Sequence, residues 1–319
     1  MKNILVVGAG GQIGSELVPF LRKQYGANNV IAADIDEDKC KKLSEGPWEK
    51  LDATDGNRFL EIVKKYKVDT IYNMVALLSA TGEKNPELAW KINMGALENS
   101  LNIAKEHNCA VFTPSSIGAF GPTTPKDNTP QDTIMQPNTI YGVCKVSGEL
   151  LSNYYYQRYG VDTRSVRFPG IISNVTLPGG GTTDYAVEIY YEAIKKQQYT
   201  CNLQKGTFLD MMYMPDAVKA CVDLMEANPE KLIHRNSFNI SAMSFDPEMI
   251  GDEIKKHIPE FNMDYNIDKV KQTIADSWPN SMDDNCAREE WGWNPQFNLA
   301  AMTIDMLEKI EEKHQNGLI

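Results

Sequence analysis

The feature that most constrains the fold is a glycine-rich turn between a short apolar run and a helical segment. Residues 4–14 read ILVVGAGGQIG, so a β-branched run leads directly into glycines at Gly8, Gly11 and Gly14. This GxxGxxG spacing is typical of a tight turn in which backbone approaches a phosphate and a helix packs closely on a strand. The N–H groups at the helix N-terminus then favour a bound anion. The turn therefore predicts a pyrophosphate site.

Short apolar runs alternate with helical segments through the first half of the chain. This alternation predicts parallel β-α-β crossovers and an α/β fold with a doubly wound parallel sheet of the Rossmann type. The expected strands are 4–7, 30–33, 70–74, 110–113 and 163–168, and the expected helices are 13–25, 56–66, 86–107 and 140–159.

An acidic residue strengthens the cofactor prediction. Asp34 ends the second predicted strand, about twenty residues beyond the glycines, where a carboxylate accepts hydrogen bonds from both adenosine ribose hydroxyls. A carboxylate at this place repels a 2′-phosphate, so NAD is favoured over NADP. The alternative interpretation of Asp34 is a simple turn residue.

After Pro169 the pattern weakens, which predicts a smaller C-terminal substrate lobe. Helices are expected at 185–197, after Pro215, at 247–257 and at 299–313, with a strand at 237–240. We divide the chain into an NAD-binding domain at 1–170 and a substrate-binding lobe at 171–319. The stretch 207–241 is expected to return to the first domain. The glycine-rich loop at 178–181 is a candidate lid hinge.

A tyrosine and a lysine supply candidate catalytic groups. Tyr141 and Lys145 lie four residues apart in YGVCK, on one face of a predicted helix. A nearby ammonium and an oxidised nicotinamide lower the pKa of a phenol, which is about 10 in isolation. The phenolate then takes a proton from an alcohol while hydride leaves for NAD⁺. Ser115 or Ser116 would hold the alcohol oxygen. The alternative is a solvated surface pair.

Composition narrows the classes of partner. The formal net charge of −11 disfavours binding to nucleic acid or to anionic membranes. The six cysteines form no CxxC pair and do not cluster in sequence with the four histidines, which favours free thiols over disulfides or a zinc site. The first apolar run is too short for a signal sequence, and no stretch reaches the length of a membrane span. We therefore expect a cytoplasmic protein without a metal site.

These motifs, in this order, resemble the extended short-chain dehydrogenases of the sugar-nucleotide epimerase-like branch. The resemblance covers nearly the whole chain and implies catalytic roles for Ser116, Tyr141 and Lys145, with Ser115 as an alternative. It also implies a homodimer that pairs through helices 86–107 and 140–159. The implied cofactor-binding residues, with Asp52 at the adenine, are Gly8, Gly11, Gln12, Ile13, Gly14, Asp34, Asp52, Ala76, Asn93, Tyr141 and Lys145.

Longer strings at 77–83, 114–122, 179–185, 211–216 and 281–293 resemble the short-chain L-threonine 3-dehydrogenases. That resemblance implies oxidation of the C3 hydroxyl of L-threonine to 2-amino-3-oxobutyrate, with NADH formed. It adds Ser79, Thr182 and Thr183 to Ser115, Ser116 and Tyr141 as substrate-binding residues. Thr183 as a helix N-cap and Ser79 as a turn residue are the alternatives.

Two other functions stay open. A UDP-sugar epimerase or dehydratase on the same fold usually carries an arginine near 206–212 for the substrate diphosphate. This chain reads GTFLDMM there, which counts against a nucleotide sugar. A non-enzymatic sensor of the NAD/NADH ratio is disfavoured because Tyr141, Lys145 and a serine are all present. Trp278, Trp291 and Trp293 are interpreted as packing residues.

Overall fold

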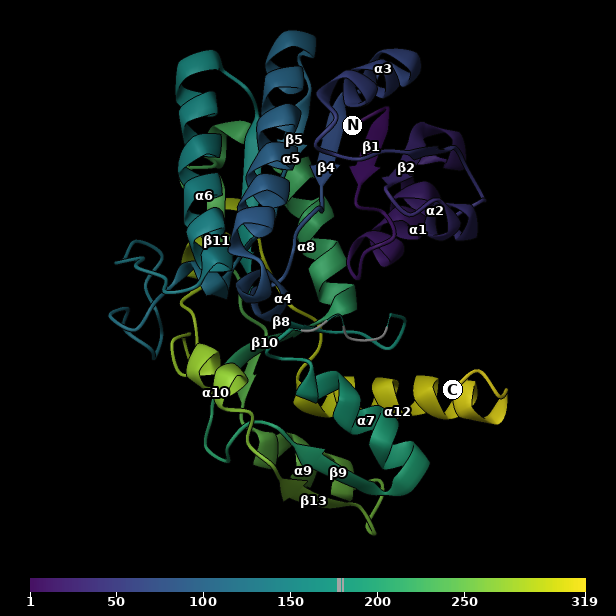
Figure 1. Ribbon diagram of the computed structural model, residues 1–319, viewed down its shortest axis with the longest axis vertical. Coiled ribbons are helices and arrows are strands. Elements are labelled where there is room, and N and C mark those ends of the chain that lie inside the picture. The colour runs from purple at the N-terminus through teal and green to yellow at the C-terminus, as the bar shows by residue number, and fades with distance from the viewer. Residues whose placement is uncertain (177–178, 180) are drawn as a thin grey trace.

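A computed structural model describes residues 1–176, 179 and 181–319. Its upper part in Figure 1 is a parallel sheet in the order β11-β7-β5-β4-β1-β2-β3. The short β6 (Ser115–Ser116) pairs with β7 at its carboxyl end. The strands of the main order are β1 (Ile4–Val7), β2 (Val30–Asp34), β3 (Trp48–Lys50), β4 (Thr70–Asn73), β5 (Ala110–Phe112), β7 (Thr163–Phe168) and β11 (Asn236–Asn239).

Helices cover both faces of this sheet because alternate strand residues point to opposite sides. Ile4 and Val6 join the core formed with α1 (Gly14–Tyr25) and α8 (Met214–Glu226). Leu5 and Val7 join the core formed with α3 (Gly56–Tyr66) and α5 (Pro86–His107). On that second face, α6 (Ile140–Tyr159) packs along α5. The predicted doubly wound Rossmann sheet is therefore confirmed.

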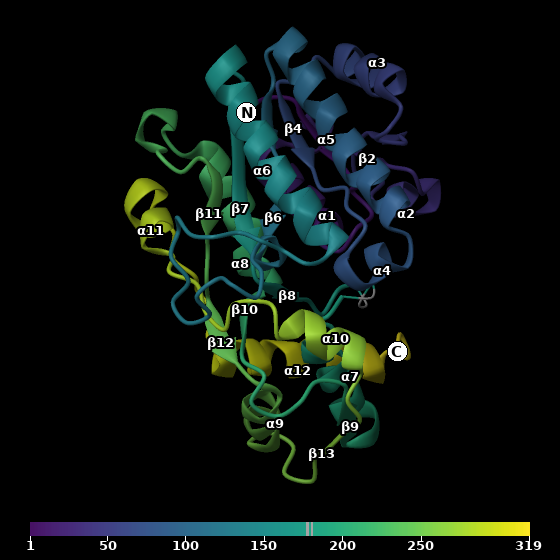
Figure 2. The same ribbon diagram turned by 60° about the vertical axis from the view of Figure 1, so that its left-hand side comes forward.

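The lower part of the molecule is a smaller lobe with a core of its own (Figures 1 and 2). The strands β8 (Gly170–Ile172), β10 (Leu209–Tyr213) and β12 (Met243–Phe245) form a second sheet between the two parts. The other elements of the lobe are α7 (Tyr185–Lys196), β9 (Gln198–Cys201), α9 (Pro247–Lys255), β13 (Asn262–Tyr265), α10 (Lys269–Ala275) and α12 (Leu299–Gln315).

Each strand and helix predicted from the sequence forms, with bounds that agree to within two residues. The helices without a prediction are short: α2 (Glu37–Lys42), α4 (Ser79–Lys84), α10, α11 (Asn285–Trp291), and 3₁₀ turns at Ala27–Asn29, Ile117–Ala119 and Pro229–Lys231. Strands β3, β6, β8, β9, β10, β12 and β13 had no prediction either, because a few residues give too little periodicity to detect.

The chain crosses between the two parts more than once. From β10 it passes through α8, which packs against α1, to β11, which pairs with β7. Later, α11 packs against β11, and Ala287 and Trp293 lie in the same core as α1 and α8. This second return, near residue 290, was not expected from the sequence. The boundary at residue 170 stays a prediction.

Within the part of the chain that the structure describes, no helix is both long enough and apolar enough to span a membrane.

Candidate active site

A cavity of about 540 Å³ lies between the carboxyl ends of the central strands and the lobe. In a doubly wound sheet this edge is where nucleotides bind, because the crossovers on either side of the central strands diverge there. Trp278, interpreted from the sequence as a packing residue, is buried and also lines this cavity. The predicted site residues that line it are Gly11, Gln12, Ile13, Gly14, Ala76, Ser79, Ser115, Ser116, Tyr141, Lys145, Thr182 and Thr183.

The glycine turn forms one wall of the cavity. Gly8 has a φ of +79°, a conformation that favours glycine, and its N–H donates to the Ala33 carbonyl at 2.8 Å. A Cβ built on Gly14 would lie 2.4 Å from the Gly8 carbonyl oxygen and 2.9 Å from the Ala9 Cα. Only glycine at position 14 therefore allows the helix to begin this close to the strand. A turn that leaves backbone N–H groups at a helix N-terminus fits a bound pyrophosphate.

Asp34 is tied to this turn. One of its carboxylate oxygens accepts a hydrogen bond from the Gly10 N–H at 2.8 Å, and the other accepts from the Asp36 N–H at 2.9 Å. A Cβ on Gly10 would lie 2.6 Å from the Lys39 side chain. Gly10 and Lys39 also line the cavity but were not predicted as site residues from the sequence. Gly10 is not one of the three glycines of the GxxGxxG spacing, and no motif includes Lys39.

Tyr141 and Lys145 extend from one face of α6 into the cavity. The Lys145 Nζ donates to the Pro114 carbonyl at 2.6 Å and lies 5.3 Å from the centre of the Tyr141 ring. The ammonium is therefore anchored to the end of a strand and held beside the phenol. Burial raises the pKa of the Cys144 thiol, so the cysteine inside this motif stays protonated.

The two candidate serines have different surroundings. Ser115 is buried, and its hydroxyl donates to Glu149, whose carboxylate receives two hydrogen bonds from Arg167 at 3.0 and 2.9 Å. The Ser116 Oγ instead accepts from the Gly118 N–H at 3.1 Å.

Gly118 links Ser116 to the tyrosine. A Cβ built on Gly118 would lie 3.0 Å from the Tyr141 ring and 3.5 Å from the Ser116 Oγ. The Ser116 hydroxyl thus lies on the side of the phenol, whereas the Ser115 hydroxyl is committed to the buried ion pair.

Hydroxyl groups line the side of the cavity that faces the lobe. Ser79 begins α4, and its Oγ lies 3.5 Å from the Oγ1 of Thr182; both residues are buried. The N-cap alternative for Thr183 is wrong, because Asp184 occupies the N-cap position of α7. Two residues of the proposed hinge loop, Pro178 and Gly180, lie outside the described residues.

Four predicted cofactor residues are not among the described residues that line the cavity: Gly8, Asp34, Asp52 and Asn93. Gly8 and Asp34 shape the turn from behind, as described above. The Asn93 amide accepts from the Leu77 N–H at 2.7 Å and donates to the Leu77 carbonyl at 3.2 Å, so it holds the segment that carries Ala76. Asp52 is exposed, and one oxygen accepts from the Thr54 N–H and hydroxyl.

The fold and the cavity define a nucleotide-dependent enzyme that carries a Tyr–Lys pair. The chain belongs to the NAD dependent epimerase/dehydratase family, whose model matches residues 4–241. It is therefore an NAD-dependent oxidoreductase, as the resemblance implied.

Similar proteins extend over the whole chain. An uncharacterized epimerase/dehydratase of Staphylococcus saprophyticus is 56% identical over 316 residues, 99% of each chain. A solved structure of L-threonine dehydrogenase from Clostridium difficile is 58% identical with a TM-score of 0.96, over 98% of each chain. A monomeric L-threonine 3-dehydrogenase from a metagenome is 43% identical with a TM-score of 0.93, over 97% of this chain and 99% of that one.

Proposed function

We propose that this enzyme oxidises the C3 hydroxyl of L-threonine to 2-amino-3-oxobutyrate and transfers the hydride to NAD⁺. The observation that carries the proposal is the convergence of the glycine turn, the Tyr141–Lys145 pair and the buried hydroxyls of Ser79 and Thr182 on one cavity. The likeness to two L-threonine dehydrogenases over nearly the full chain supports the choice of substrate.

Tyr141 is the general base of the proposed reaction. Lys145, held by the Pro114 carbonyl, places a positive charge beside the ring, where it would stabilise negative charge that develops on the phenol oxygen during the reaction. The phenolate takes the proton of the C3 hydroxyl, and Ser116 holds the oxygen in place. Bound NAD⁺ supplies the acceptor for the hydride that leaves C3. Loss of that proton and that hydride converts the C3 alcohol to a ketone.

The cofactor is assigned to the glycine-turn side of the cavity. Gln12, Ile13 and Gly14 would hold the pyrophosphate with backbone N–H groups, while Gly8 and Gly11, whose N–H groups bond within the turn, would let the backbone approach it. Asp34, whose carboxylate already fixes Gly10, would accept the ribose hydroxyls, and Asp52 would lie at the adenine. Ala76 would contact the cofactor directly, with Asn93 acting through Leu77.

The substrate is assigned to the lobe side. A small zwitterion needs hydroxyl and backbone donors for its carboxylate, and Ser79, Thr182 and Thr183 supply hydroxyls there. A UDP-sugar is disfavoured because 206–212 contains no arginine, and because β10 buries Leu209–Tyr213 completely. The six cysteines are free thiols, five of them buried, and a cytoplasmic location is part of the proposal.

The test is NAD⁺ reduction with L-threonine as sole substrate, followed through NADH absorbance, beside Tyr141→Phe. Phenylalanine keeps the ring and removes the acid–base group, so we expect kcat to fall about 10²- to 10⁴-fold with NAD binding intact. Full turnover by the variant would remove Tyr141 as the base. Wild-type protein that binds NAD but does not oxidise threonine would contradict the proposal. Titration with UDP-sugars then separates the two alternatives, because an epimerase or dehydratase would bind them and an NAD/NADH sensor would not.

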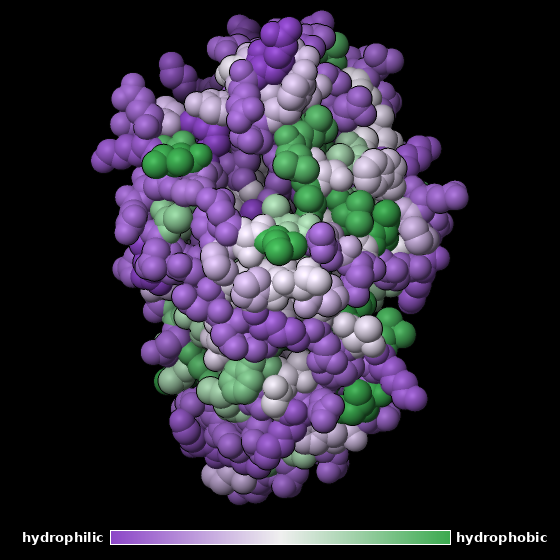
Figure 3. All heavy atoms as spheres, turned by 90° about the vertical axis from the view of Figure 1, so that its left-hand side faces the viewer, coloured by the Kyte–Doolittle hydropathy of each residue, from purple (hydrophilic) through white to green (hydrophobic). Residues whose placement is uncertain are grey.

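A homodimer through α5 and α6 is part of the proposal. The face that carries α6 shows hydrophobic side chains among hydrophilic ones (Figure 3). Exposed large hydrophobic residues on the two helices are Leu88, Trp90, Val143, Leu150, Tyr154, Tyr156 and Tyr159. Because one similar enzyme is described as monomeric, sedimentation of wild type against Leu150→Glu decides the state: a dimer would dissociate in the variant.

A further inference from the structure

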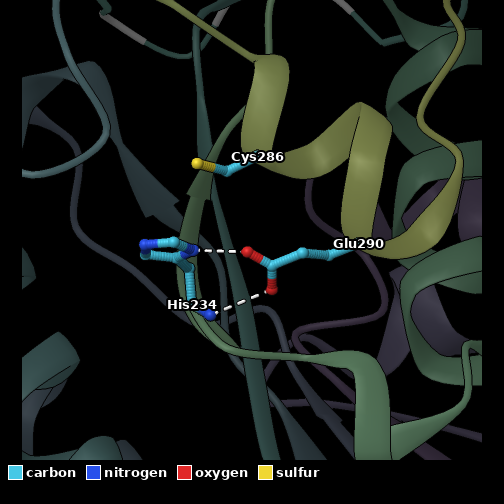
Figure 4. Close-up of side chains that lie close together, drawn as sticks. All are labelled: His234, Cys286 and Glu290. Carbon is cyan, nitrogen blue, oxygen red and sulfur yellow. Dashed lines mark hydrogen bonds and ion pairs between the residues drawn. The ribbon is translucent and has the colours of Figure 1, made fainter.

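Three side chains with metal-binding atoms meet beside β11, where Figure 4 shows them pointing toward one another. Cys286 and Glu290 lie four residues apart on α11 and therefore share one helix face. His234 comes from the segment that leads into β11. The Cys286 sulfur, a His234 ring nitrogen and a Glu290 oxygen all lie within 4.8 Å of one another.

We propose that His234, Cys286 and Glu290 bind a Zn²⁺ ion, with water in the fourth position. Thiolate, imidazole and carboxylate are the donors that zinc takes in proteins, at metal–ligand distances of about 2.0–2.3 Å. Two ligands of a tetrahedral ion at those distances lie roughly 3.5 Å apart. Small side-chain rotations therefore suffice to close the arrangement around an ion.

The surroundings of the three ligands already hold them in position. The Glu290 Oε1 faces the His234 Nδ1, while its Oε2 accepts from the Ile233 and His234 backbone N–H groups at 2.5 and 3.1 Å. On the other edge of the imidazole, the Asp132 carboxylate lies 3.5 Å from Nε2. A metal-bound histidine typically gives its second N–H to a carboxylate, so Nδ1 binds the ion and Asp132 orients the ring.

Charge at this place also favours a cation. The Asp132 carboxylate beside the His234 ring adds a negative charge to that of Glu290. Cys286 is half-buried, whereas the other five cysteines are fully buried. It is thus the thiol that an ion reaches from solvent.

The site is separate from the active site, and the inference does not rest on the proposed function. Of the described residues that line the active-site cavity, none belongs to this group. A bound ion would add a further link between α11 and the segment that leads into β11, which are distant in sequence and already meet through packing and the hydrogen bonds of Glu290. Its effect is therefore on the stability of this edge of the sheet. The sequence gives no sign of this site, because His234 lies far from Cys286 and Glu290 along the chain.

Two titrations of the chelator-treated full chain test the proposal. Calorimetry with Zn²⁺ measures stoichiometry and affinity, and Co²⁺ reports a bound thiolate through its sulfur-to-metal charge-transfer absorption. We expect one equivalent of metal and a charge-transfer band in the wild type. Cys286→Ser should abolish the charge-transfer band. Cys286→Ser and Glu290→Gln should each weaken Zn²⁺ binding by about 100-fold or more, which is more than the loss expected when a residue that only hydrogen-bonds a metal ligand is removed.

The matched control is Glu289→Gln, the neighbouring exposed acid on the same helix, which removes the same charge and should leave binding unchanged. Circular dichroism checks that each variant folds, and Cys286→Ser changes a single atom. Wild-type binding no tighter than that of Cys286→Ser would overturn the proposal. So would Co²⁺ binding without a thiolate band, or a loss in Glu289→Gln as large as that in Glu290→Gln.

Discussion

The two walls of the active-site cavity are built differently. The wall formed by the main sheet consists of backbone: a glycine turn, strand ends, and a carbonyl that anchors Lys145. The wall on the lobe side consists of side chains, chiefly the hydroxyls of Ser79, Thr182 and Thr183 with the indole of Trp278. Phosphates of a common cofactor can be held by backbone N–H groups, provided that glycines let the backbone come close. A particular substrate has to be distinguished by side chains, so we expect substrate choice to depend on the wall that faces the lobe.

The buried residues that pack behind the two walls also differ in kind. Behind the sheet wall, Glu149 and Arg167 form a buried ion pair that also receives the Ser115 hydroxyl. Arg167 donates further to the Gln131 carbonyl and to the Asn239 side chain. Behind the lobe wall the core is apolar and aromatic, with Tyr185, Tyr190 and Phe245 fully buried. The sheet side is fixed by directional bonds, whereas the lobe side is held by packing.

The largest expected effect comes from breaking the buried ion pair. Glu149→Gln leaves the Arg167 charge unpaired, which should lower the free energy of unfolding by about 3–5 kcal/mol. Urea denaturation measures the change, with Glu98→Gln on exposed α5 surface as the control. A loss below about 1 kcal/mol would mean that the sheet wall does not depend on this pair.

A smaller effect is expected from filling the space at the glycine turn. Gly14→Ala sets a methyl group against the Gly8 carbonyl, so stability should fall by about 1–3 kcal/mol and NAD should bind at least about tenfold more weakly. Gly95→Ala is the control, since its Cβ would lie 3.5 Å from Thr54 in ordinary contact. Isothermal titration with NAD separates the two variants. Equal affinities would show that the turn tolerates a side chain.

Asp34→Ala tests whether one side chain matters on the backbone wall. Losing a charged acceptor of the Gly10 N–H should raise KM for NAD⁺ about 10- to 100-fold and leave KM for L-threonine in place. Asp36→Ala removes a neighbouring acid that only caps α2, so its KM values should match the wild type. A rise in the threonine KM as large as that for NAD⁺ would break the division between the walls.

The smallest effect is expected on the lobe side. Thr182→Val keeps the shape and removes the hydroxyl near Ser79, which should raise KM for L-threonine about tenfold without changing KM for NAD⁺. Thr303→Val, equally buried but bonded to Tyr190 in the lobe core, controls for lost stability. If both substitutions act alike on KM, the Thr182 hydroxyl does not contact substrate.

The sequence by itself determined the sheet, the cofactor turn and the Tyr–Lys pair. Each is encoded locally: the apolar runs set the strands, Gly8 and Gly14 set the turn, and Tyr141 and Lys145 share a helix face through spacing alone. Because the residues of each motif are close together in sequence, the motif can be recognised without the structure.

Tertiary structure decided everything that depends on contacts between distant segments. Ser115 and Ser116 are equivalent in sequence, and only the fold directs one to Glu149 and the other toward Tyr141. Ser79 meets Thr182, and His234 meets Cys286, because strand pairing and helix packing bring remote segments together. No local sequence pattern encodes these contacts, because their geometry depends on how the whole core packs.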